Sequence, residues 1–163
     1  MSRPKIDIKW ETSDYLIEEL ALAGLVALIV VPVYYYFQLP DQVPIHFGID
    51  GKADAYGSKT MIWLLPLIGG ILYIMMTVTN RYPHIFNYPV KINEGNAYNQ
   101  YKNATRLIRI LKAIITVSFA YIIYAQIQSA QGNQSGLGNY FIPVFLVIIL
   151  SNTGYYLYKS SRM

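Results

Sequence analysis

The sequence predicts an all-α membrane protein folded as a four-helix transmembrane bundle. Three observations favour this class: hydrophobic residues make up 54% of the 163 residues, charged residues make up only 13%, and the mean hydropathy is +0.30. Such a composition does not cover an ordinary water-soluble surface. It fits a chain whose main solvent is lipid, where backbone polar groups find no water and spanning segments are therefore helices.

The stretches without charge define four spans. A bilayer core of about 30 Å requires about 20 mainly apolar residues per helix. Charge-free runs of this length lie between Glu19 and Asp41 and between Lys59 and Arg81. A longer uncharged run, 113–158, is divided by a polar segment at 126–139. We therefore expect one integral membrane domain, residues 1–163, with spans near 18–38, 61–80, 106–127 and 140–158.

The basic residues predict the orientation of the bundle. Eleven of the thirteen Lys and Arg residues lie in the regions 3–9, 81–112 and 159–162. Positively charged flanks remain preferentially in the cytoplasm. We therefore expect both termini and the loop 81–105 to be cytoplasmic, and the polar loop 39–60 to lie at the outer face.

Composition also excludes several classes of protein. The chain contains no cysteine, which rules out disulfides and thiolate metal sites. Its net charge of +4 reflects membrane topology, because no soluble basic domain is present to bind nucleic acid. A secretory signal is disfavoured, since five acidic residues precede the first span and the segment 33–37 is not a small-residue cleavage site.

The outer loop 39–60 is the densest group of polar residues, and two interpretations of it stay open. In the structural one, its glycines, prolines and aspartates form tight turns and the loop is a rigid lid. In the functional one, His46, Asp50 and Asp54 hold a divalent metal or act as an acid and a base. We expect no cofactor, since the only other histidine, His84, is predicted to lie on the opposite side of the membrane. The candidate residues of this loop are His46, Phe47, Asp50, Gly51, Asp54, Gly57 and Lys59.

The helix of the third span is expected to begin near Asn93 or Asn96, before the membrane. Its basic residues fall within an arc of about 120° at helical spacing. One interpretation is that they reach lipid phosphates, and the other is that they dock an acidic cytoplasmic partner. The candidate residues of this cytoplasmic face are Asn96, Tyr101, Lys102, Arg106, Arg109 and Lys112.

The outer loop resembles a known family. A Pro-x-His-Phe element is followed by Gly, Asp, Gly and Lys, and the stretch 87–101 resembles a segment before the family's third helix. This pattern is similar to domain-of-unknown-function family 1648, as found at the N-terminus of SdpI-type immunity proteins. The resemblance implies a multi-pass protein of the bacterial cytoplasmic (inner) membrane. SdpI-type proteins protect their producers against a secreted killing peptide and are thought to hold a repressor at the membrane. The matching residues are Pro44, His46, Phe47, Gly51, Asp54, Gly57 and Lys59.

From topology and resemblance together we expect a non-enzymatic membrane protein that presents the 39–60 loop for peptide, lipid or protein recognition. One alternative is a metal-assisted membrane enzyme with its site at the outer interface. Another is a subunit of an oligomeric pore or transporter, although the charge-free runs hold none of the ionisable groups that ion-coupled carriers use. The expected partners are membrane lipid, an extracytoplasmic peptide or protein, a cytoplasmic regulator and further copies of the chain, but no nucleic acid.

Overall fold

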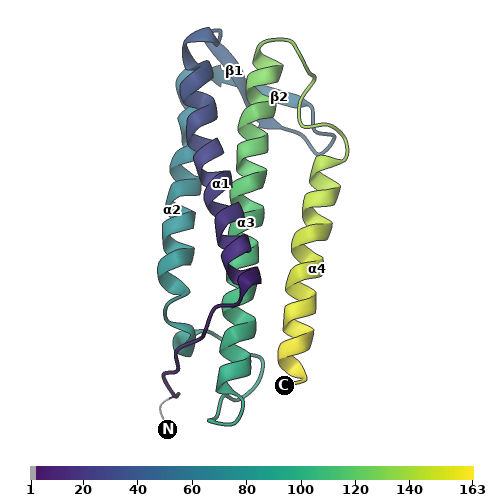
Figure 1. Ribbon diagram of the computed structural model, residues 1–163. Coiled ribbons are helices and arrows are strands. Elements are labelled where there is room, and N and C mark those ends of the chain that lie inside the picture. Colours follow the sequence, from purple (N-terminus) through teal and green to yellow (C-terminus); the bar gives the residue numbers. More distant parts are fainter. Residues whose placement is uncertain (1–2) are drawn as a thin grey trace.

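The structure is a computed structural model that describes residues 3–163. Four helices run side by side, and both termini lie at the same end of the bundle (Figure 1). All four are long and apolar enough to cross a membrane, once the 3-10 turn Lys59–Trp63 is counted with the second helix. The predicted four-helix membrane architecture is therefore confirmed. The helices are α1 (Thr12–Tyr35), α2 (Leu64–Thr79), α3 (Ala97–Ala130) and α4 (Phe141–Ser161).

The loop 39–60 adds an element that the all-α prediction lacked. Its residues form an antiparallel hairpin of two strands, β1 (Gln42–Phe47) and β2 (Ala53–Ser58). An isolated two-stranded hairpin is only marginally stable in water. Here Val43 is fully buried and packs into the core cluster that contains Leu28 and Ile123 of the neighbouring helices. The hairpin is thereby anchored on the bundle, and we call this end of the molecule the hairpin end.

The third helix is the centre of the bundle. It contacts the other three helices, whereas α4 makes its main contacts with α3 and stands apart from α1 and α2 (Figure 1). The helices α1 and α3 approach each other closely at Gly24, where an added Cβ would lie 2.7 Å from Thr116 Oγ1. A glycine at this position lets the two backbones meet.

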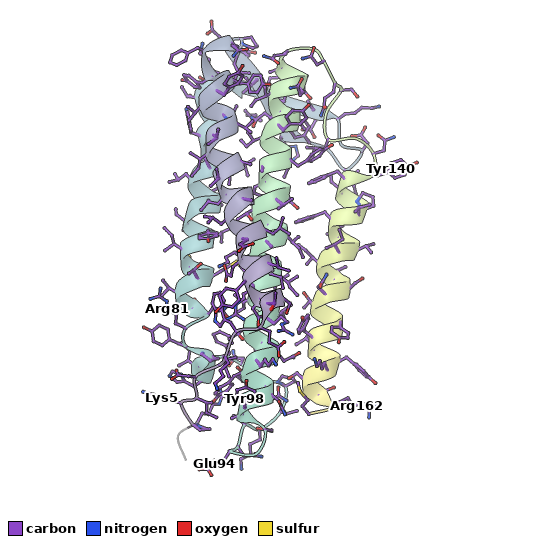
Figure 2. All side chains as sticks on the ribbon, in the orientation of Figure 1. Lys5, Arg81, Glu94, Tyr98, Tyr140 and Arg162 are labelled. Atoms are coloured by element: carbon purple, nitrogen blue, oxygen red, sulfur yellow. The ribbon has the colours of Figure 1, made fainter. Side chains whose placement is uncertain are left out.

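The opposite end of the bundle, which we call the terminal end, carries both termini and the loop between α2 and α3. Lys5, Arg81 and Arg162 all lie there, whereas Tyr140 lies towards the hairpin end (Figure 2). Two long-range hydrogen bonds fix α4 at this end: Gln100 Nε2 donates to the Ser160 carbonyl over 2.7 Å, and Asn103 Nδ2 donates to the Tyr156 carbonyl over 2.9 Å. The termini and the loop between α2 and α3 thus share one end of the bundle, and the side of the membrane that this end faces stays a prediction.

Candidate functional site

The hairpin brings together two of the predicted site residues. His46 and Asp54 lie on the two strands, and His46 Nδ1 is 2.5 Å from Asp54 Oδ1. Both side chains are exposed, by 68% and 52%. A short hydrogen bond between an imidazole and a carboxylate fixes the ring orientation and makes a small polar group at the surface.

The other charged residues of the loop do not join this pair. Asp50 Oδ1 accepts the backbone N–H of Lys52 over 3.1 Å, which closes the turn of the hairpin, and its Oδ2 lies 3.7 Å from Lys52 Nζ. Lys59 Nζ lies 3.2 Å from Asp41 Oδ1 instead. Within residues 3–163, no group of three or more His, Cys, Asp or Glu side chains is arranged to hold a metal ion.

Two glycines of the hairpin, Gly51 at its tip and Gly57 near its base, have a structural role. Gly51 has a φ of 75°, and its carbonyl accepts the N–H of Leu137 over 2.8 Å. A Cβ at Gly51 would lie 2.5 Å from the carbonyl oxygen of Gly138. At Gly57, a Cβ would lie 3.0 Å from Ile45 Cδ1. The tip of the hairpin is therefore docked, backbone to backbone, on the loop between α3 and α4.

An apolar cleft of about 450 Å³ lies beneath the hairpin. Its polar groups are His46 and Gln126, and Gln126 Nε2 donates to the Pro44 carbonyl and so holds β1 against α3. The hairpin reaches across from the α1–α2 side towards the start of α4, so the cleft lies between the hairpin and the hairpin ends of three helices (Figure 1). Apolar clefts with a few placed polar groups are the usual form of ligand sites. The apolar lining comprises Ile45, Phe47, Met61, Leu64, Leu65, Ile122, Leu137, Phe141, Ile142, Phe145 and Leu146.

Of this lining, the sequence analysis identified only His46 and Phe47. Ile45 lies beside them on β1, and the remaining residues come from α2, its preceding turn, α3, α4 and the loop before α4. Except for Gln126 and Leu137, which lie in the polar segment 126–139, these residues belong to ordinary apolar runs. A span facing lipid and a span facing a cleft have the same composition, so no signal in a single sequence separates them.

A second group of polar side chains joins α1 to α3 towards the terminal end. Carboxylates at positions 11, 14 and 18 face cations at positions 102, 106, 109 and 112, and both sets recur every three or four residues. We call these seven side chains the charge network. Its ion pairs join Lys102 and Arg106 to Glu11, Arg106 and Arg109 to Asp14, and Arg109 and Lys112 to Glu18.

The side chains of Arg109 and Lys112 are paired inside the bundle and do not extend outward to lipid phosphates. The side chains of Arg109 and Lys112 are only 5% and 1% exposed, and Lys112 Nζ lies 2.6 Å from Glu18 Oε2. Lys112 also donates to Thr77 Oγ1 over 2.9 Å. The sequence did contain a signal for this pairing, because the acidic residues before the first span recur at the same spacing as these basic residues. They supply the negative groups that the second interpretation assigned to a separate partner.

The two uncharged residues of the predicted cytoplasmic face have local roles. Tyr101 is fully buried and donates its hydroxyl to the Pro4 carbonyl over 3.0 Å, which holds the N-terminal segment on α3. Asn96 occupies the N-cap position of α3, but its side chain bonds the Asn93 N–H and the Lys91 carbonyl. The start of α3 therefore lies where the sequence predicted it.

Hydrogen bonds from Arg106 and Lys102 also act on Glu11, which lies just before α1. They stabilise its charged form and lower the pKa of this carboxyl below its usual value of 4.5. Glu11 is therefore ionised at neutral pH and ties the end of the N-terminal segment to α3.

Comparison with known proteins finds similarity to a protein family over part of this chain. A family model described as "Domain of unknown function (DUF1648)" matches residues 23–70, which run from α1 through the hairpin into α2. An "Uncharacterized protein" from Archaeoglobus fulgidus is 28% identical over 142 residues, and the alignment covers 78% of each chain. No solved structure matches.

These findings define a multi-pass membrane protein with a segment similar to DUF1648. The resemblance to that family is confirmed over the hairpin and its flanking helices, while its SdpI-type context and the bacterial inner membrane stay predictions.

Proposed function

We propose that this protein is a non-enzymatic binding protein of the bacterial cytoplasmic membrane, which takes an amphipathic ligand at the hairpin end. The observation that carries this proposal is the apolar cleft of about 450 Å³ beneath the exposed His46–Asp54 pair. An apolar chain fits the interior of the cleft, and a polar group fits beside the imidazole and the carboxylate at its edge.

The docking of the hairpin supports a preformed site. Gln126 holds β1 against α3, and Gly51 holds the tip on the loop before α4, so both walls of the cleft are set before a ligand arrives. Preorganisation of this kind reduces the entropic cost of binding. The resemblance to SdpI-type proteins favours an extracytoplasmic peptide as the ligand. A lipid, with its apolar chain and polar headgroup, would fit the same cleft.

A comparison of two tryptophan variants tests the proposal. Leu64 lines the cleft, whereas Leu67, one turn further along α2, is 62% exposed and does not line it. Leu64→Trp should fill the cleft and Leu67→Trp should not. Native mass spectrometry of the protein released from phosphatidylglycerol nanodiscs, with and without a synthetic amphipathic peptide, measures what each variant retains.

We expect the wild type and Leu67→Trp to retain one lipid or peptide per chain, and Leu64→Trp to lose it. The mass of the retained ligand distinguishes a lipid from a peptide. Equal retention by all three proteins, or no retention by any of them, would contradict the proposal.

A further inference from the structure

The polar groups of the cleft beneath the hairpin define the chemistry of its ligand further. Gln126 lines this cleft and is only 5% exposed. Its Nε2 donates to the Pro44 carbonyl, whereas its Oε1 accepts no hydrogen bond within residues 3–163. This oxygen is not among the unpaired atoms that are sealed from solvent, so it is open to the cleft. A largely buried acceptor without a donor favours a ligand that supplies one.

The His46–Asp54 pair adds two further acceptors at the edge of the cleft. An ionised carboxylate only accepts, so the hydrogen bond to Asp54 Oδ1 places the proton of a neutral imidazole on Nδ1. The second ring nitrogen, Nε2, then carries a lone pair. In the part of the chain that the structure describes, neither this nitrogen nor Asp54 Oδ2 makes a hydrogen bond. The edge of the cleft therefore suits a group that donates.

The charge of the hairpin end favours a donor that is also a cation. Asp50 Oδ2 lies 3.7 Å from Lys52 Nζ, and Asp41 Oδ1 lies 3.2 Å from Lys59 Nζ, so both lysines are compensated. Within residues 3–163, the third aspartate, Asp54, has no lysine or arginine partner and pairs only with the imidazole. One negative charge is thus left at the edge of the cleft. Within residues 20–80 and 113–158, which form the hairpin and the apolar runs around it, the charged side chains are Asp41, Asp50, Lys52, Asp54 and Lys59.

We propose that the ligand of this cleft is an apolar peptide that carries a primary ammonium group, such as that of a lysine. An ammonium group has three donors and no acceptor, so it bonds both His46 Nε2 and Asp54 Oδ2 at the edge. A backbone N–H of the peptide donates to Gln126 Oε1 inside the cleft. A phospholipid fits less well, because its phosphate needs donors and both lysines of the hairpin are already paired. This inference rests on the proposed function and adds the charge of the ligand to it.

Three versions of one apolar peptide test the inference. They differ only at a single lysine, which is unmodified, acetylated or succinylated, so that the side chain is cationic, neutral or anionic. Native mass spectrometry of the protein released from phosphatidylglycerol nanodiscs measures how much of each peptide is retained. The nanodiscs are kept at a pH of about 8, where an ordinary imidazole is neutral and a lysine is charged.

Two substitutions locate the charge that selects the peptide. Asp54→Asn removes the carboxylate of the pair and keeps the shape of the side chain. Asp41→Asn is its matched control, because it makes the same change of charge at a side chain that is 97% exposed and neither lines the cleft nor contacts His46. Leu64→Trp, which should fill the cleft, shows how much retention is independent of it.

We expect the wild type and Asp41→Asn to bind the lysine peptide about tenfold more tightly than the acetylated or succinylated one, because only the ammonium makes a hydrogen bond to a charged group. Asp54→Asn should lose this preference, and Leu64→Trp should retain none of the three peptides. The comparison of the three peptides on the wild type needs no substitution, so it decides the matter even if Asp54→Asn fails to fold.

Equal retention of the three peptides by the wild type, together with their loss in Leu64→Trp, would overturn the ammonium assignment and leave the cleft as a binding site. A preference that persists unchanged in Asp54→Asn would also overturn it. Retention of phosphatidylethanolamine from mixed nanodiscs in place of the lysine peptide would assign the cleft to a lipid instead. No retention of any peptide or lipid would overturn the proposed function as well.

Discussion

At the scale of single residues, Gly51 shows why the loop motif contains a glycine at this position. Its positive φ and its contact with the Gly138 carbonyl both exclude a side chain. We expect Gly51→Ala to destabilise the protein by about 1–3 kcal/mol, because it adds backbone strain to a steric clash. The control is Gly70→Ala in α2, where an added Cβ would meet nothing within 4 Å. Thermal melting in detergent would contradict this explanation if the two variants had the same midpoint.

A second prediction at this scale concerns Glu11. Its pKa is lowered in the folded protein, mainly by the hydrogen bond from Arg106, so its contribution to stability is present above its usual pKa of 4.5. That contribution is lost as the pH falls through the lower folded-state pKa. We expect the N-terminal segment to detach from α3 in this acid range, and the change to be smaller in Glu11→Gln.

The fluorescence of Trp10 in a Trp63→Phe background reports this detachment, since Trp10 lies over the Arg109 guanidinium in the attached state. The same acid transition in Glu11→Gln and in the parent protein would show that Glu11 does not hold the segment.

At the scale of elements, the charge network determines how α1 and α3 pair. Lys112 is 1% exposed and faces Glu18, so Lys112→Met leaves a largely buried carboxylate without its closest partner. Removal of one partner from a buried pair typically costs about 3–5 kcal/mol, whereas a surface pair contributes about 0–1 kcal/mol. Lys102→Met, from a pair whose carboxylate is half exposed, is the matched control.

We expect Lys112→Met to be much less stable than Lys102→Met in denaturant titrations, and Glu18→Gln combined with Lys112→Met to recover part of the loss. If the double variant shows only the sum of the two single losses, the pair is not coupled.

The elements also show how far the sequence alone can lead. Four spans follow from the lengths of the charge-free runs, because the thickness of the bilayer requires them. The same rule places the charged residues outside the spans. The helices α1 and α3 nevertheless begin before their spans, at Thr12 and Ala97. These extra turns carry charged residues into the bundle, where the acidic face of α1 neutralises the basic face of α3. The hairpin was missed because Pro44 and Gly57 are poor strand formers, and its stability comes from the packing of Val43 against helices distant in sequence.

At the scale of the whole molecule, the orientation in the membrane decides on which side of the membrane a ligand enters the cleft. The basic residues at the terminal end predict that this end is cytoplasmic and that the hairpin end faces outward. The apolar cleft beneath the hairpin would then be open to the extracytoplasmic space. A ligand arriving from outside therefore meets the His46–Asp54 pair first.

Single cysteines test this orientation against a clean background, since the chain contains none of its own. Ser135 is exposed in the loop before α4, and Ser161 is exposed at the terminal end. In intact bacterial cells, we expect a membrane-impermeant maleimide to label Ser135→Cys at once and Ser161→Cys only after lysis. The reverse pattern would place the hairpin in the cytoplasm, and the search for an outer ligand of the cleft would then have to turn to cytoplasmic molecules.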